Sequence, residues 1–589
     1  MEMEKFLRYF SALSLLIVTL ASSSCSEEFL IKEPRGVAAG SVISSPEGVE
    51  AVLIAAYSCL QGRHMFGGAL CTDWMYGSIP SDDSYYGPYP LYPPLERYEV
   101  TPSHPYVSQR WVDCYNGAAG ANRTLEQLAE NLKGNNPIPQ QRALQIEAEA
   151  KFLRAWFHFQ ANKVFEKIPY IKTKAELYPL LPEMVPNYDP AWDSIEEDLQ
   201  FAIDNLPASR SAAEPGRVHK YAAESVLAHA HMYQNELSLA RPLLDDIINS
   251  GLFELAPEFY YNYDMTHENN SESIFEIQAA TTATAHSSIY PAGSAFFQKG
   301  PASCSGWGFF QPSQCLFEAF QVTDDGLPVL EIENREPLAH DQGIASSDTF
   351  IPTGHLLDPR VDWTIARRGI DFLGWGINAG NDWIVIANYG GPYMTKKYMH
   401  LKSEQVLNNY GTGFYNGKNY RMYRLANILL WRAEIAVEDG DLELARSLVN
   451  QVRNRAKNST PVMGLCTSYE NLGKDPVVDW TQPAANYKIE PYPEGHVAFT
   501  NKEEARKAVR MEIRLEFATE GHRFFDLRRW EIDDEVLNDY IVRDVAFRRF
   551  MTGTVYDPEK HDYWPLPRQA VEEQKGVLLQ DPDYVNVPY

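Results

Sequence analysis

Three glutamates near the C-terminus have the type and spacing that could support acid–base chemistry. Glu512, Glu516 and Glu520 recur every four residues, which places their carboxylates on one face of a helix. Glycoside hydrolysis uses two carboxyl groups, but they must flank the scissile bond from opposite sides. Basic and acidic side chains are interleaved with the glutamates: Arg510, Arg514, His522, Arg523, Asp526, Arg528 and Arg529. We therefore expect a structural ion-pair network rather than a catalytic pair.

The remaining sequence offers no positive case for catalysis or for a bound cofactor. Its 14 histidines form no HExxH motif, its 7 cysteines form no CxxC pair, and no GxSxG, P-loop or GxGxxG motif occurs. His229 and His231 are two residues apart on a predicted helix, so they point to different faces. Asp439 and Asp441 lack the later ligands of a calcium loop and predict a turn. We predict no enzyme, no metal site and no cofactor, with a structural calcium ion left open.

Aromatic residues in loop-like text give the stronger functional signal. Aromatic rings stack on the C–H faces of sugars, while nearby Asp, Asn and Arg bond the hydroxyl groups. The alternative is that most of these rings fill the interior of the loops, as large aromatics usually do. The first stretch holds Trp74, Tyr76, Tyr85, Tyr86, Tyr89, Tyr92 and Tyr98, and the second holds Tyr290, Trp307, Phe309, Phe310, Trp375, Trp383 and Tyr389. A few exposed rings would suffice for a glycan platform.

Composition excludes one class of partner. The chain has 589 residues, with 44% hydrophobic and 12% aromatic residues, enough for a sizeable core. Its formal charge of −27 is spread along the chain and would repel phosphate backbones. We therefore expect no nucleic-acid partner.

Helical periodicity alternates with loop-rich text along the chain. Helices are predicted at about 47–62, 106–250, 420–457 and 501–530, loop-rich regions at about 71–105 and 255–418, and an irregular tail at 540–589. The runs SIFEIQ and DWIVIAN in the central insertion alternate as short strands do. Residues 228–247 and 433–452 align without a gap. Ala228 and Ala240 match Ala433 and Ala445, and this spacing predicts two closely packed antiparallel helix pairs of tetratricopeptide type.

The N-terminus predicts export. FSALSLLIVTL (10–20) is too short to span a bilayer but fits the apolar region of a secretory signal. Glu2 and Glu4 offset the basic residues before it, so translation from Met3 is an alternative start. Among the other cysteines, Cys304 and Cys315 are either bridged or a pair of buried free thiols.

Several motifs, in a consistent order, resemble the SusD/RagB family of outer-membrane nutrient-binding lipoproteins of Bacteroidota. They are CSEEFLIKEPRG (25–36), AEAKFLRAWFHFQANKVFEKIPYI (148–171), SGWGFFQPSQCLFEAFQVTDDG (305–326), DPRVD (358–362), YRLANILLWRAEIAVEDGD (423–441), RNRA (453–456) and EIRLEFATEGHRFFDLRRW (512–530). One departure is Glu166-Lys167, which stands where the family commonly has glycine followed by a small acidic or polar residue.

The resemblance implies a fold and an architecture. The fold is mainly α, with tetratricopeptide-like helical pairs forming a right-handed superhelical body and a large loop-rich region containing a few short strands. A signal peptide (1–24) would precede a single domain (25–589). Cys25 would become the lipidated first residue, and Ser26-Glu27-Glu28 resembles an acidic tag for the outer face of the outer membrane.

The resemblance also implies a function. The protein would bind oligosaccharide at the cell exterior without catalysis and hand it to a SusC-like TonB-dependent transporter. The binding residues implied are Trp74, Asp83, Tyr85, Tyr86, Tyr290 and Trp307, on the loop-rich side. Two alternatives are a family member that captures peptides and a helical-repeat scaffold that binds protein on its concave helical face.

Overall fold

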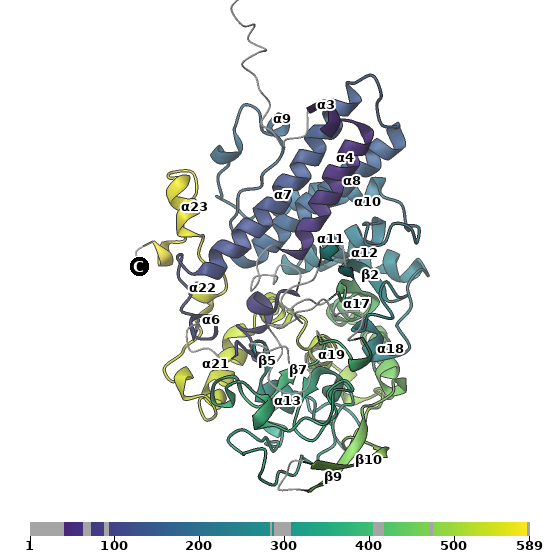
Figure 1. Cartoon of the computed structure of the whole chain (residues 1–589), viewed down its shortest axis with the longest axis vertical. Helices are drawn as coiled ribbons and strands as arrows, with labels where there is room; N and C mark the ends of the chain where they lie inside the picture. The colour runs from purple at the N-terminus through teal and green to yellow at the C-terminus, as the bar shows by residue number, and fades with distance from the viewer. Residues whose placement is uncertain are drawn as a thin grey trace, which may run out of the picture.

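The computed structural model describes residues 40–62, 72–87, 93–282, 285–287, 308–397, 399–404, 417–470 and 475–585. Helices dominate these residues, and short strands accompany the loop-rich part (Figure 1). The predicted mainly α fold with a few strands is therefore confirmed. Within the same residues, no helix combines the length and the apolar character needed to cross a lipid bilayer.

The helical body is built from two runs of antiparallel helices. In the first run, consecutive helices pack on one another, and in the second α17 packs on α18 and α19. Contact between α12 and α17 joins the runs. The first run contains α4 (Pro46–Ser58), α7 (Pro105–Leu132), α8 (Gln140–Phe165), α10 (Trp192–Asn205), α11 (Lys220–Tyr233) and α12 (Leu237–Asn249). The second contains α17 (Leu425–Asp439), α18 (Leu442–Asn458), α19 (Lys502–Phe517), α20 (Arg523–Arg529) and α21 (Asp533–Asp544).

The two aligned segments form equivalent helix pairs, as predicted. The alanines at the contacts, Ala228 and Ala240 in α11–α12 and Ala433 and Ala445 in α17–α18, are fully buried. Small side chains at these points let the helix backbones approach closely. Both turns use a left-handed residue, Asn235 at φ 57° and Gly440 at φ 84°.

The strands pair in five two-stranded antiparallel sheets within the described residues. They are β1 (Ser84–Tyr85) with β5 (Gln311–Pro312), β2 (Ser273–Ile277) with β8 (Tyr420–Arg424), β3 (Ala280–Thr282) with β4 (Ala285–Ser287), β6 (Ile365–Ala366) with β7 (Met394–Thr395), and β9 (Met463–Glu470) with β10 (Asp475–Pro483). The SIFEIQ run forms β2. The DWIVIAN run forms no strand: it begins in a 3-10 turn, η6 (Asn381–Trp383), and ends in a single helical turn, α15 (Ala387–Gly390).

Local sequence explains where α19, the helix that carries Glu512 and Glu516, begins. The Asn501 side chain accepts a hydrogen bond from the Glu504 amide at 3.0 Å and so caps the helix. Glu503 and Glu504 occupy the first turn and Arg514 the last turn, which complements the helix dipole. The tail beyond α21 is irregular apart from short helices such as α22 (Pro558–His561) and α23 (Arg568–Glu573).

The unusual Glu166 sits at a strained turn at the end of α8. Its backbone has φ 58° and ψ −77°, and the Lys167 amide donates to the Phe165 carbonyl at 2.7 Å. These angles and this bond define the rare form of the γ-turn, which is unfavourable for a residue with a Cβ. Glycine lacks the Cβ that makes positive φ costly.

Replacing Glu166 with Gly should therefore raise the free energy of unfolding by about 1 kcal/mol, because the backbone strain is relieved. Chemical denaturation monitored by circular dichroism would measure the change. Lys167→Gly is the matched control, since Lys167 is not among the residues with positive φ. Equal destabilisation by both substitutions would show that the turn at Glu166 is not strained.

Candidate functional site

The residues predicted to bind ligand fall into two groups. Trp74, Asp83, Tyr85 and Tyr86 are described, and each side chain is buried. Tyr290 and Trp307 lie outside the described residues, as does Cys25. The assignment of all six as ligand contacts stays a prediction.

Pairing between β1 and β5 brings the two loop-rich regions together. Ser84 pairs with Pro312 and Tyr85 with Gln311, while the Phe310 amide donates to the Tyr86 carbonyl at 2.9 Å. The segment that contains Tyr85 and Tyr86 therefore lies directly against the segment that follows Trp307.

An aromatic cluster fills the interior at this junction. The rings of Trp74 and Tyr86 are stacked with centroids 6.1 Å apart, and Phe310 lies 5.5 Å from Trp74. The hydroxyls of Tyr86 and Tyr106 are hydrogen-bonded at 2.8 Å. For these rings, the alternative of filling the loop interior is the one that the structure adopts.

Asp83 and its neighbour Asp82 fasten the first loop to the helical body. Arg514 of α19 contacts Asp83 at 2.9 Å and Asp82 at 2.8 Å, and Arg523 of α20 contacts Asp82 at 2.8 Å. Burial raises the pKa of Asp82, but the two guanidinium groups outweigh it and bring the pKa below its ordinary value. For Asp83, burial prevails over Arg514 and the pKa is raised. The shared arginine holds the loop against α19.

Tyr85 forms the base of a column of stacked groups that reaches the surface. The Arg548 guanidinium lies 3.7 Å from the centre of the Tyr85 ring and 4.6 Å from that of Phe550. The rings of Phe550 and Tyr389 are parallel within 5°, with centroids 4.3 Å apart. We call Tyr85, Arg548, Phe550 and Tyr389 the aromatic column. It connects a buried predicted residue to two partly exposed rings.

Polar groups accompany the outer end of the column. The Arg97 guanidinium donates to the Phe550 carbonyl and pairs with Glu99 at 2.9 Å. Burial raises the pKa of Tyr389, and the nearby Arg97 lowers it in part. A partly exposed ring beside an arginine and an exposed carboxylate provides a stacking face together with hydrogen-bonding groups, which is what a sugar requires.

Two hollows of the described surface lie elsewhere. Each has a volume of about 480 Å³ and borders the 214–217 loop between the helical body and β2. Their polar side chains are already engaged: Arg217 pairs with Glu149 and Glu50 at 3.0 Å, and Glu276 accepts from the Asn269 amide at 3.0 Å. Few groups remain there to recognise a polar ligand.

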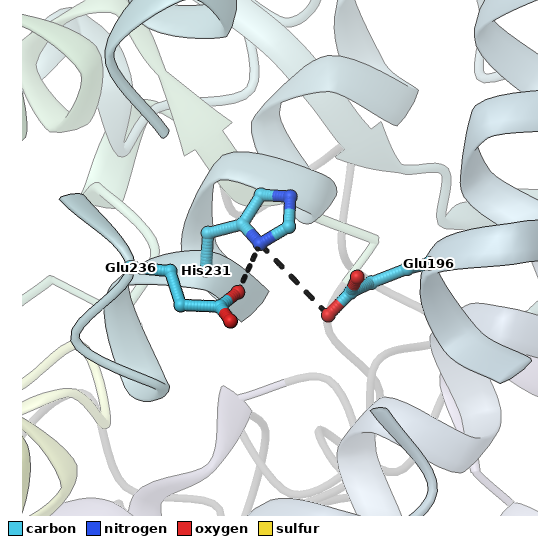
Figure 2. Close-up of side chains that lie close together, drawn as sticks. All are labelled: Glu196, His231 and Glu236. Carbon is cyan, nitrogen blue, oxygen red and sulfur yellow. Dashed lines mark hydrogen bonds and ion pairs between the residues drawn. The ribbon is translucent and has the colours of Figure 1, made fainter. Parts of the chain in front are cut away.

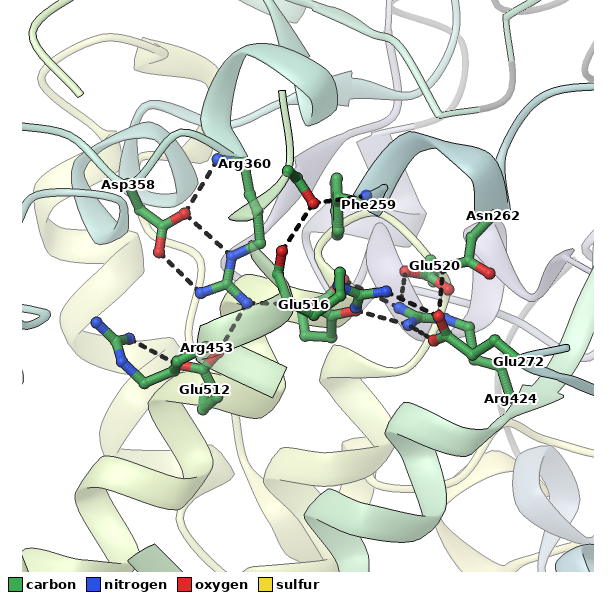
Figure 3. A network of polar contacts seen from close by, with 12 residues as sticks. Phe259, Asn262, Glu272, Asp358, Arg360, Arg424, Arg453, Glu512, Glu516 and Glu520 are labelled. Atoms are coloured by element: carbon green, nitrogen blue, oxygen red, sulfur yellow. Dashed lines mark hydrogen bonds and ion pairs between the residues drawn. The ribbon is translucent and has the colours of Figure 1, made fainter. Parts of the chain in front are cut away.

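Glu512 and Glu516 of α19 lie in a buried ion network with Glu520 (Figure 3). The four-residue spacing predicts Glu520 on the same helix face, but α19 ends at Phe517 and places Glu520 in the turn before α20. Glu512 contacts Arg360 at 2.7 Å and Arg453 at 2.8 Å. Glu516 contacts Arg424 at 2.6 Å, and Glu520 contacts Lys397 at 2.8 Å. The glutamate side chains are 0%, 0% and 6% exposed, so no substrate reaches them in this structure. The expected structural role is confirmed, but the cations are not the interleaved ones: they come from distant segments, whereas Arg514 and Arg523 pair with Asp82.

The network is electrostatically matched. Burial alone would raise the pKa of Glu516, but Arg455, Arg424 and Arg360 lower it well below the ordinary range. Burial likewise raises the pKa of Glu520, but Lys397 and Arg424 outweigh it and lower that pKa to about 2. Both glutamates therefore stay ionised at neutral pH, as acceptors for the arginines.

Sequence reasoning missed part of the aromatic column. Arg548 and Phe550 lie in the FRRF run at 547–550, within the tail predicted to be irregular. Two arginines flanked by phenylalanines in that run could have indicated stacking between cationic and aromatic side chains. Cys315 is a free thiol, while Cys304 lies outside the described residues.

Comparison with known proteins identifies the family. A family model described as the SusD family matches residues 271–584, more than half of the chain. The chain belongs to the SusD family. A second model, described as starch-binding associating with outer membrane, matches residues 28–232 of this SusD-family chain. The resemblance stated from the motifs is therefore confirmed.

Relatives of this SusD-family chain match it nearly end to end. A SusD-like protein of Formosa agariphila is 25% identical over 575 residues, which are 95% of each chain. A solved SusD superfamily protein of Bacteroides vulgatus is 19% identical, with a TM-score of 0.65, over 91% of this chain and 99% of that one. Such structural likeness confirms the fold.

Two solved structures carry ligand information about themselves. One, described as a laminarin-binding SusD-like protein, is 22% identical with a TM-score of 0.63, over 92% of this chain and all of its own. The other is surface glycan-binding protein A from Bacteroides thetaiotaomicron in complex with laminarihexaose. It is 19% identical with a TM-score of 0.63, over 91% of this chain and 99% of its own.

Replacing Glu516 with Ala should lower the free energy of unfolding by about 3–5 kcal/mol, because it leaves buried guanidinium groups without a counter-ion. Urea denaturation would measure the loss. Glu503→Ala on the same helix is the control, since Glu503 is 78% exposed and pairs with Lys507 at only 3.8 Å. A change of similar size in both variants would contradict a structural role for the network.

Proposed function

We propose that this protein is a cell-surface glycan-binding lipoprotein that captures oligosaccharide and delivers it to a SusC-like TonB-dependent transporter. Membership of the SusD family carries this proposal. Likeness to proteins described as binding laminarin and laminarihexaose supports oligosaccharide as the ligand class. Binding proceeds without catalysis, in keeping with the burial of the only carboxylate row that the sequence offered.

The outer end of the aromatic column is a proposed part of the glycan surface. Tyr389 stacks on Phe550 through one face and is partly exposed, so a sugar ring can stack where the column reaches solvent. Arg548 sits between Tyr85 and Phe550 and holds the outer rings rigidly. Rigid rings lose little conformational entropy when a ligand binds. Tyr85 would then act through the column, and Trp307 would contact glycan from the neighbouring loop.

Lipidation of Cys25 is the proposed means of attachment to the outer membrane, facing the exterior. A body with charge −27 is repelled by anionic lipid, so it needs an anchor to remain at a membrane. Acyl chains supply one, because each buried CH₂ contributes roughly 0.8 kcal/mol. The family model named for association with the outer membrane supports this placement.

Replacing Tyr389 with Ala should weaken binding of laminarihexaose by about tenfold, because one stacking face is lost. Isothermal titration calorimetry of the purified protein would measure it, with Trp307→Ala tested beside it. Trp480→Ala is the control, since Trp480 is an exposed aromatic residue on the separate β9–β10 hairpin. Loss of binding in the control alone would place the site on that hairpin. Binding of peptides but no glycan across a ligand panel would favour the peptide-capturing alternative.

Replacing Cys25 with Ala should move the protein from the membrane fraction to the soluble fraction while glycan affinity stays unchanged. Fractionation followed by immunoblotting would measure the distribution, and Cys59→Ala is a matched control at a cysteine within the folded body. Affinity purification of the wild type from gentle detergent extracts should retain a large β-barrel transporter. Retention of the Cys25 variant in membranes would contradict lipid anchoring at this residue.

A further inference from the structure

Three side chains with metal-binding chemistry converge on the helical body (Figure 2). Glu196 comes from α10, His231 from the last turn of α11, and Glu236 from the residue that precedes α12. Their donor atoms all lie within 4.8 Å of one another, and they are the only such group of three among the described residues. The three helices are consecutive in the chain and pack side by side.

The distances suit a small tetrahedral cation. His231 Nδ1 is 2.8 Å from Glu236 Oε2 and 3.8 Å from Glu196 Oε1. Ligands bound at 2.0–2.1 Å around a tetrahedral zinc ion lie about 3.3 Å apart, a value between the two observed distances. A small movement of Glu236 away from the imidazole and of Glu196 toward it would bring both distances to this value.

The internal repeat provides an independent comparison. Glu236 aligns with Asp441, which caps α18 by accepting a hydrogen bond from the Leu444 amide at 3.0 Å. Glu236 makes no such capping bond at α12, and its carboxylate faces the imidazole instead. The residue equivalent to His231 in the second pair is Ala436. Where the histidine is present, the aligned carboxylate therefore contacts the imidazole and not the N-terminus of the helix.

The surroundings also favour a cation. The His231 side chain is 8% exposed, whereas those of Glu196 and Glu236 are 28% and 40% exposed, so the group is anchored inside and open outside. Water can therefore supply a fourth ligand. The Gln234 side-chain amide donates to Glu196 Oε1 at 2.7 Å and orients that carboxylate. Orienting bonds of this kind hold metal ligands in place.

We propose that Glu196, His231 and Glu236 bind a divalent transition-metal cation, with Zn²⁺ the best match. One imidazole and two carboxylates with a water suit Zn²⁺, whereas Ca²⁺ requires more ligands and prefers oxygen alone. The ion would tie α10, α11 and the start of α12 together, so its role is structural. This site is separate from the aromatic column and does not depend on what the protein transports.

Titration of the full chain with Zn²⁺ alone tests the proposal. We expect one equivalent to bind, with a rise in melting temperature of about 2 °C or more at saturation. His231→Gln and Glu236→Gln should each weaken Zn²⁺ binding by about tenfold or more, since each removes a direct ligand. Glu197→Gln is the matched control on α10, because Glu197 pairs with Lys172 at 2.6 Å away from the group. Cobalt substitution should give the visible absorption of a tetrahedral site in the wild type.

Two results would overturn the proposal. The first is Zn²⁺ binding by the wild type that is equal in the His231 and Glu236 variants, which would place the ion elsewhere. The second is no binding by the wild type, which would leave the 2.8 Å contact as a simple hydrogen bond between His231 and Glu236. Circular dichroism establishes whether each variant is folded. If His231→Gln unfolds, Glu236→Gln still tests the site, because it changes only a partly exposed side chain.

Discussion

The ion network on α19 is the constraint on which the rest of the structure depends. Its carboxylates are buried, so each must meet a cation with good geometry or carry a large desolvation cost. The cations come from separate parts of the chain: Arg360 in the central insertion, Arg424 at the end of β8, and Arg453 in α18. Satisfying the charges therefore fixes the position of the insertion against the helices. The network contributes a defined arrangement of these segments more than it contributes net stability.

The same helix also positions the loop-rich end. Arg514 lies between two network glutamates in sequence and holds Asp82 and Asp83. The first loop also packs tightly against the turn between α19 and α20. A Cβ at Gly77 would lie 1.8 Å from the Gly521 carbonyl oxygen, so only glycine fits there. A rigid helical scaffold thus carries a well-defined aromatic interior, from which the column extends outward. Binding loops placed on rigid scaffolds in this way are common.

Sequence patterns predicted the body better than the surface. The alanines spaced twelve apart identified both helix pairs because close helix contacts demand small residues. The glutamate row predicted a structural ion network, but the cations that complete it, such as Arg360 and Arg424, come from distant segments. By contrast, Tyr85 belongs to a column only because Arg548 and Phe550 return from the far end of the chain, and no local pattern records such pairing. The β9–β10 hairpin and α21 were likewise not predicted.

The contacts that complete the loop-rich end join residues far apart in sequence. Asp83 and Arg514 are 431 positions apart, and Tyr85 and Asp544 are 459 positions apart. Because a chain emerges from its N-terminus, the first loop waits for almost the whole polypeptide before its partners exist. The ends of such long loops also close at an entropic cost. The aromatic surface can thus form only when almost the whole chain is available. Only a chain completed to α21 can present it, which ties the finished binding face to full-length translation.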